Sequence, residues 1–289
     1  MGSFSILNNI SGVNAQNQLT VNNVNLSRTL LRLSSGKRIN TGADDAAGLQ
    51  IADSLRSNVG ALNQAVRNAN DGISVSQIAD GALAEISNVL TRAVTLAEEA
   101  ATDTTDSTGR VSLNQEFTQI EAEIGRIANQ TNFNGSKLFG TSAGDVNGTL
   151  NVFVGDVGAG KSSISVTIGS ITASGGNVTN IGNSVNLQTV DLTTATGAAS
   201  ALVTIKNAVA AVSNSRANIG SGINRLQSAV AVLQSQSQNT QAAESTIRDA
   251  NVAEEVANLT KYQILAQSGI AALTQANSNS ELAVGLLRR

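Results

Sequence analysis

The sequence contains no cysteine, histidine, proline or tryptophan among its 289 residues. The lack of cysteine excludes disulfides, thiol catalysis and thiolate metal sites, and the lack of histidine removes the commonest general base and metal ligand. Because proline interrupts helices, its absence suits long uninterrupted ones. Aromatic residues make up only 2% although 41% of the residues are hydrophobic. The apolar content is therefore mainly Ala, Val, Ile and Leu, which is typical of thin helix–helix seams.

Charge and hydropathy exclude several classes of partner. The net charge is −3 and no basic block stands out, so neither nucleic acid nor a membrane surface is expected as a partner. No run of 18 apolar residues occurs, so no segment is expected to span a bilayer. The first 30 residues are rich in Asn, Ser and Gln and lack a basic start followed by an apolar stretch, so a cleaved Sec signal is not expected.

Helical periodicity accounts for most of the chain. Apolar residues recur at alternating steps of three and four in three long segments, the spacing of amphipathic helices. It predicts a long helix over 44–100, a return helix over 110–130 and a third helix over 199–239. Arg216 alone interrupts the apolar stripe of the third helix.

The middle of the chain has a different character. Residues 138–198 are rich in Gly, Ser, Thr and Asn, and apolar residues alternate over Leu150–Val154 and Ile164–Ile168. Alternation predicts half-buried strands, and hence a β-hairpin region. The expected fold is mainly α: a long antiparallel coiled-coil or helical-bundle rod formed by the N- and C-terminal segments, with this small β-hairpin region in the middle.

The two ends carry apolar stripes at helical spacing. Helices at both termini need a partner, and each end is the nearest partner of the other. A stripe left uncovered after that pairing must be buried by another copy of the chain, which predicts an assembly protein. The residues of this predicted assembly stripe are Leu19, Leu26, Leu30, Leu33, Val256, Leu259, Ile270 and Leu273.

One segment imitates a nucleotide-binding loop. Residues Gly155–Ser162 fit the Walker A pattern, which requires a strand before the loop and a helix after it. The residues that follow alternate with period two and are rich in β-branched types, so they predict a strand. We therefore interpret the segment as a glycine-rich hairpin turn and expect no cofactor.

The adjacent carboxylates Asp44 and Asp45 offer a second apparent site. Neighbouring side chains on a helix point about 100° apart and do not converge on one ion or substrate. Their place at the start of the long predicted helix favours an interaction with the positive end of the helix dipole. No catalytic, cofactor-binding or metal site is expected anywhere in the chain.

Ordered motifs at both ends resemble those of bacterial flagellin. They cover roughly residues 1–170 and 200–289. The hook–filament junction protein shares the terminal pattern and is the alternative, but the matches at Arg67–Ser74 and Thr131–Gly135 favour flagellin. The other matching motifs are Leu33–Asn40, Asp44–Gly48, Arg248–Ala250, Gln263–Leu265, Gln275–Asn277 and Leu286–Arg288.

The resemblance implies a domain plan and a function. Residues 1–43 with 240–289 would form the inner, terminal coiled-coil domain, and residues 44–239 the rod domain. The short middle implies that the outer variable domain of larger flagellins is absent. The function implied is that of a structural subunit that self-assembles into the helical filament of the flagellum and serves motility.

The resemblance also implies partners and a location. Flagellins are exported unfolded by the flagellar type III apparatus without a cleaved signal peptide, and they bind a dedicated chaperone through their C-terminal helices. They polymerise beneath a cap and next to hook-associated proteins, outside the cell. The lack of cysteine and the few aromatic residues fit a chain that is threaded through a narrow channel.

Many flagellins are recognised by Toll-like receptor 5, and this chain matches three residues of the recognition motif: Arg92, Leu96 and Glu116. A fourth position, a glutamate in the motif, is Thr95 here. Taken without the resemblance, the same residues predict only a solvated charged face around a core leucine.

Overall fold

The computed structural model describes residues 9–140, 145–155, 162–174, 177–181 and 185–287. The chain divides into two compact units. The terminal unit contains Met1–Val59 and Gln238–Arg289, and the central unit contains Gly60–Ser237.

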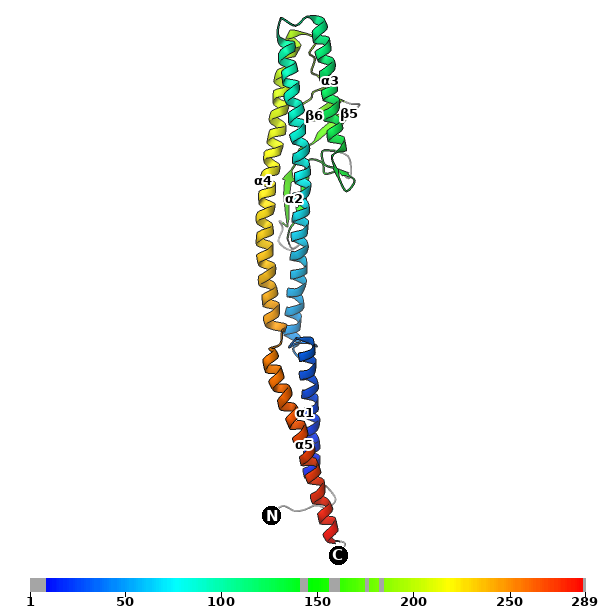
Figure 1. Ribbon diagram of the computed structural model, residues 1–289, viewed down its shortest axis with the longest axis vertical. Helices are drawn as coiled ribbons and strands as arrows, with labels where there is room; N and C mark the ends of the chain where they lie inside the picture. Colours follow the sequence, from blue (N-terminus) through cyan, green and yellow to red (C-terminus); the bar gives the residue numbers. More distant parts are fainter. Residues whose placement is uncertain (1–8, 141–144, 156–161, 175–176, 182–184, 288–289) are drawn as a thin grey trace. The chain divides into compact units, whose positions relative to one another are not determined.

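Five helices are present in the described residues, and they confirm the mainly α class (Figure 1). They are α1 (Ile10–Ser35), α2 (Ala46–Ala101), α3 (Ser107–Gln130), α4 (Ala195–Arg248) and α5 (Val252–Leu287). The helix predicted for 199–239 is longer than expected, because the Gln- and Ser-rich stretch that follows Leu233 continues as helix to Arg248. Glutamine is a good helix former, so a polar stretch weakened the apolar pattern without ending the helix.

The central unit has one hydrophobic core, to which α2, α3 and α4 all contribute. Polar pairs show that α2 and α4 run antiparallel: Asn63 contacts Ser237 at 3.0 Å, and Asp80 contacts Arg216 at 2.8 Å. The second pair explains why Arg216 interrupts an apolar stripe, since its guanidinium lies beside a carboxylate of the neighbouring helix. Among the described helices only α4 is long and apolar enough to cross a membrane, and its Ile205 is fully buried in this core.

Three antiparallel hairpins lie between α3 and α4. They pair β1 (Asn132–Phe133) with β2 (Ser136–Lys137), β3 (Thr149–Phe153) with β4 (Ser163–Thr167), and β5 (Ile171–Ser174) with β6 (Asn177–Ile181). The first hairpin precedes the predicted region; it turns at Asn134 and Gly135, both with positive φ. A strand, not a helix, follows the Walker-like segment, as predicted, although residues 156–161 lie outside the described residues.

Glycines let the β3–β4 hairpin approach both long helices. A Cβ placed on Gly72 of α2 would lie 2.5 Å from a methyl carbon of Val152 in β3. A Cβ on Gly222 of α4 would lie 2.6 Å from a methyl carbon of Val166 in β4. Both distances are shorter than any relaxed carbon–carbon contact. The two glycines therefore provide the space in which the hairpin packs.

Glu121 on α3 is a buried carboxylate, with only 6% of the residue exposed. One of its oxygens accepts a hydrogen bond of 2.7 Å from the backbone N–H of Val178 in β6. Burial raises the pKa of Glu121 above its ordinary value of 4.5, and the hydrogen bond from Val178 opposes part of that rise. Folding therefore makes ionisation of the Glu121 carboxyl less favourable than it is in the unfolded chain.

We expect Glu121→Gln to stabilise the central unit near neutral pH and to lose this advantage in acid. Because the folded pKa lies above the unfolded one, the parent loses stability as pH rises from 4.5 through the folded value. Glutamine keeps an acceptor for Val178 and never ionises. Thermal unfolding of both chains at about pH 3.5 and about pH 7 measures the difference.

Glu123→Gln on the same helix is the matched control. Its carboxylate pairs with Arg126, whose side-chain hydrogen bond lowers the pKa of Glu123, so the sign is reversed. Glu123→Gln should not stabilise the central unit relative to the parent chain at either pH. An equal effect of Glu121→Gln at both pH values would contradict the account of the buried charge.

Candidate assembly surface

The terminal unit is built on the pairing of α1 with α5, which lie side by side (Figure 1). The least exposed positions of each helix recur at alternating steps of three and four residues, so each helix presents one seam to the other. The seam positions are Gly12, Ala15, Leu19, Asn22, Leu26, Thr29 and Leu33 in α1, with Glu255, Leu259, Tyr262, Ala266, Gly269, Leu273 and Ala276 in α5.

The two connectors that flank this helix pair are hydrogen-bonded to each other. Helix α1 ends at Gly36, which adopts a left-handed conformation with φ of 69°. The Gly36 carbonyl accepts from the Ala250 N–H at 3.0 Å, and the Arg38 N–H donates to the Arg248 carbonyl at 2.7 Å. The segment that follows α1 and the end of α4 are thus tied together where α1 and α5 begin their pairing.

Asp44 and Asp45 have separate structural roles at the start of α2. Asp45 accepts a hydrogen bond of 2.9 Å from the Gly48 N–H in the first helical turn. Asp44 accepts from the backbone N–H and the hydroxyl of Thr41, both at 3.0 Å, and these bonds lower the pKa of Asp44. The helix-start prediction is confirmed for Asp45, whereas Asp44 closes the turn that precedes the helix, and the two carboxylates do not act as a pair.

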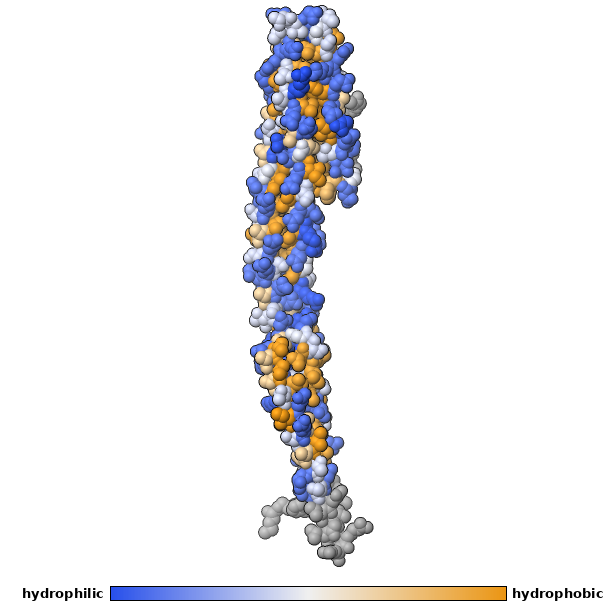
Figure 2. Space-filling view, viewed as in Figure 1, coloured by the Kyte–Doolittle hydropathy of each residue, from blue (hydrophilic) through white to orange (hydrophobic). Residues whose placement is uncertain are grey.

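Large apolar side chains remain exposed on the outside of the terminal unit. Their exposed fractions run from 38% to 65%. Figure 2 shows hydrophobic patches on the surface formed by α1 and α5. Such a concentration on one unit marks an interaction surface rather than scattered exposure. The exposed residues are Ile10, Val13, Val21, Val24, Leu30, Leu31, Ile51, Val252, Val256, Ile264, Leu265 and Ile270.

The structure divides the eight predicted stripe residues into two groups. Leu19, Leu26, Leu33, Leu259 and Leu273 lie half-buried in the α1–α5 seam. The other three face outward, with exposed fractions of 47% for Leu30, 44% for Val256 and 54% for Ile270. Each helix is apolar on more than one side, so periodicity alone did not reveal which stripe faces the partner helix.

The predicted stripe omits nine of the fourteen seam positions, and in α5 these include Glu255, Tyr262 and Gly269, none of which is an aliphatic side chain. Only the strict seven-residue recurrence of the seam in α5 could have signalled them.

The three receptor-motif residues do not form one surface. Two nitrogens of Arg92 donate to Glu116 at 3.0 and 2.8 Å, and both side chains are about half exposed. Leu96 is fully buried in the core of the central unit, with 0% exposure. The structure therefore shows the arrangement expected without the resemblance, an exposed ion pair above a core leucine.

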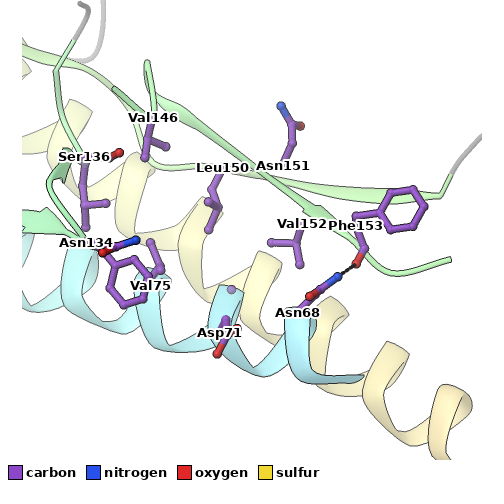
Figure 3. Close-up of a pocket in the computed structure, with 13 residues that line it drawn as sticks. Asn68, Asp71, Val75, Asn134, Ser136, Val146, Leu150, Asn151, Val152 and Phe153 are labelled. Carbon is purple, nitrogen blue, oxygen red and sulfur yellow. Dashed lines mark hydrogen bonds between the residues drawn. The ribbon is translucent and has the colours of Figure 1, made fainter. Parts of the chain in front are cut away.

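The central unit also carries an open groove (Figure 3). It has a volume of about 390 Å³ and lies between α2 and the strands β1 and β3. The amide of Asn68 donates to the Phe153 carbonyl at 3.1 Å along one side. Among the described residues that line it, Asp71 is the one titratable group, so the groove offers no acid–base pair. No metal-binding group of acidic, His or Cys residues occurs in the described chain.

These features define a class of protein. A chain that pairs its two ends and exposes apolar side chains on the outside of that pair has the architecture of a self-associating helical structural protein.

Comparisons with known proteins identify the family. The bacterial flagellin N-terminal helical region matches residues 6–143, and the bacterial flagellin C-terminal helical region matches residues 202–287. Flagellin of Halalkalibacterium halodurans is 36% identical over 283 residues, covering 98% of this chain and 99% of that protein. Flagellin FlaB1 of Treponema pallidum is 35% identical over 288 residues, with the same coverage. The crystal structure of Bacillus cereus flagellin, 26% identical, covers 62% of this chain and 94% of that chain, with a TM-score of 0.45.

The chain belongs to the bacterial flagellin family. It is a structural subunit of the flagellar filament, exported outside the cell, and it forms a homopolymer. It is not an enzyme. None of these matches favours the hook–filament junction alternative.

Proposed function

We propose that this flagellin polymerises through the outward apolar faces of α1 and α5. The observation that carries the proposal is the concentration of exposed aliphatic side chains on the terminal unit, after the two helices have already covered each other. Residues 1–43 and 240–289 would form the inner coiled-coil domain of the filament, and residues 44–239 the rod domain. Relatives of matching length support the lack of an outer variable domain.

The terminal helices are expected to become ordered on assembly. Helix α1 is rich in Asn and Ser, which are poor helix formers, and its seam includes Gly12, Asn22 and Thr29. A pair with so small an apolar seam gains little on its own and more when neighbouring copies bury its outer faces. Circular dichroism should show little helix from residues 1–40 and 255–289 in the monomer and a gain on polymerisation. Equal helicity before and after assembly would contradict the proposal.

The same exposed surface supports the proposed export partners. Before assembly, the outward side chains of α5, such as Val256, Ile264 and Ile270, would aggregate unless a chaperone covered them. We propose that a flagellar export chaperone binds this helix, that the chain leaves by the type III route with its N-terminal segment retained, and that it meets the cap and hook-associated proteins at the growing end.

We further propose that the Arg92–Glu116 pair contributes to recognition by Toll-like receptor 5, without direct contact by Leu96. The match of the pair to the family motif and its exposure support this proposal. We expect Arg92→Ala to reduce receptor signalling while changing the free energy of unfolding by less than about 1 kcal/mol, because the pair is exposed.

Arg126→Ala is the matched control, since Arg126 also forms an exposed ion pair, with Glu123 on α3. It should leave signalling unchanged. A reporter-cell assay on both variants decides the matter, and full signalling by Arg92→Ala would exclude the pair from recognition.

A further inference from the structure

The α1–α5 seam is repetitive, so packing alone discriminates weakly between alternative registers. The leucines of the α1 seam, Leu19, Leu26 and Leu33, are spaced at seven residues. In α5 the small or polar seam positions Tyr262, Gly269 and Ala276 also recur at seven. Sliding α5 along α1 by one heptad would again place leucines against small seam residues. Heptad seams with this ambiguity usually rely on a polar contact to specify register.

Besides the connector hydrogen bonds that join Gly36 to Ala250 and Arg38 to Arg248, three contacts within the helix pair mark the observed register. The Asn9 amide donates to the Ala276 carbonyl at 3.0 Å near one end of the pair. In the middle, a Cβ on Gly269 would lie 3.4 Å from Leu19. At the other end, Arg32 lies 3.5 Å from Glu255. Only the last of the three involves two charges.

Both partners of the Arg32–Glu255 pair are at least partly buried and lie at helix ends. The Glu255 side chain is 10% exposed and that of Arg32 is 33% exposed. Arg32 lies in the last turn of α1 and Glu255 in the first turn of α5, so each charge also faces the favourable end of its own helix dipole. A one-heptad slip would move Glu255 by about 10 Å along the helix axis. Its carboxylate would then be largely buried without its partner, which is strongly unfavourable.

We propose that the Arg32–Glu255 ion pair, together with the adjoining connector hydrogen bonds, selects the register of the α1–α5 pair. Register decides which outward apolar side chains of the two helices lie at the same level, for example Leu31 relative to Val256. The pair is therefore a specificity determinant for the surface that neighbouring copies recognise. This inference rests on the proposed role of the α1–α5 pair in assembly.

Cysteine cross-linking in filaments tests the register directly, since the chain has no cysteine of its own. The native-register reporter combines Leu19→Cys with Gly269→Cys. Two slipped-register reporters combine Leu19→Cys with Ala276→Cys or with Tyr262→Cys. With the parent charges, we expect intrachain disulfide yield in the native reporter to exceed both slipped reporters by about tenfold.

Glu255→Gln should raise the yield of a slipped reporter toward that of the native one, and the exchange Arg32→Glu with Glu255→Arg should restore the native preference. Glu254→Gln, which changes an exposed carboxylate in the same helical turn, should leave the ratio unchanged. If the Glu255→Gln chain does not form filaments alone, a small amount of each reporter that carries Glu255→Gln is co-assembled with an excess of the parent chain, and its disulfide yield is measured in those mixed filaments.

An unchanged native preference in Glu255→Gln filaments would overturn the proposal, as would failure of the charge exchange to restore it. Filaments of the parent that show no native-register cross-link would instead contradict the proposed pairing of α1 with α5 in the filament. The two failures are thus distinguishable.

Discussion

Replacing Val256 and Ile270 together by aspartate is expected to abolish filament formation while leaving the central unit folded. Both side chains lie on the outside of α5, 44% and 54% exposed, so their loss removes little from the folded chain. In a filament they would be buried against a neighbour, where an unpaired carboxylate is strongly unfavourable. Sedimentation and electron microscopy report polymerisation, and circular dichroism reports the retained helices of the central unit.

A control with two added carboxylates on the same helix separates burial from charge. Ser268→Asp with Gln275→Asp places the charges at exposed polar positions of α5, about 100° or more around the helix from Val256, and should reduce polymerisation far less. Deleting 255–289 should have the same effect as the apolar-to-charged pair, since it removes the whole face. Normal filaments from the Val256 and Ile270 variant, or from the deletion, would refute assembly through this surface.

Substituting Gly72 by alanine is expected to destabilise the central unit by about 1–3 kcal/mol, the range for overpacking a filled core. The added methyl would lie 2.5 Å from a carbon of Val152, and both α2 and the β3–β4 hairpin are held by other contacts. Combining Gly72→Ala with Val152→Ala removes the clash, so the double variant should lose less stability than the sum of the two single losses. Urea unfolding of the four chains gives the coupling energy.

Gly81→Ala on the same helix is the matched control for helix propensity. Nothing lies within 4 Å of a Cβ at Gly81, so alanine there should stabilise by about 0.5–1 kcal/mol. If Gly72→Ala were also stabilising, the close approach of Val152 would not be limiting. A strictly additive double variant would likewise contradict the proposed contact.

The local pattern of apolar residues was sufficient to predict which side chains are buried where an element packs against a single core. The stripe that contains Ile205, Val212 and Ile219 faces a single core, so its periodicity predicted burial correctly. The alternation around Val152 and Val166 predicted a hairpin for the same reason. For the assembly stripe the pattern left the orientation of the helices open, because α1 and α5 carry apolar residues on two faces and periodicity contains no information on which face meets the other helix.

The sequence by itself determined the helices, the β3–β4 hairpin and the family, because periodicity, turn residues and ordered motifs are local and survive without knowledge of packing. Tertiary structure alone decided that Leu96 is buried beneath the Arg92–Glu116 pair, that Gly72 and Gly222 admit a hairpin, and that Arg32 meets Glu255. These contacts join residues far apart in the chain. They depend on the shape and charge of surfaces that exist only once the helices have packed.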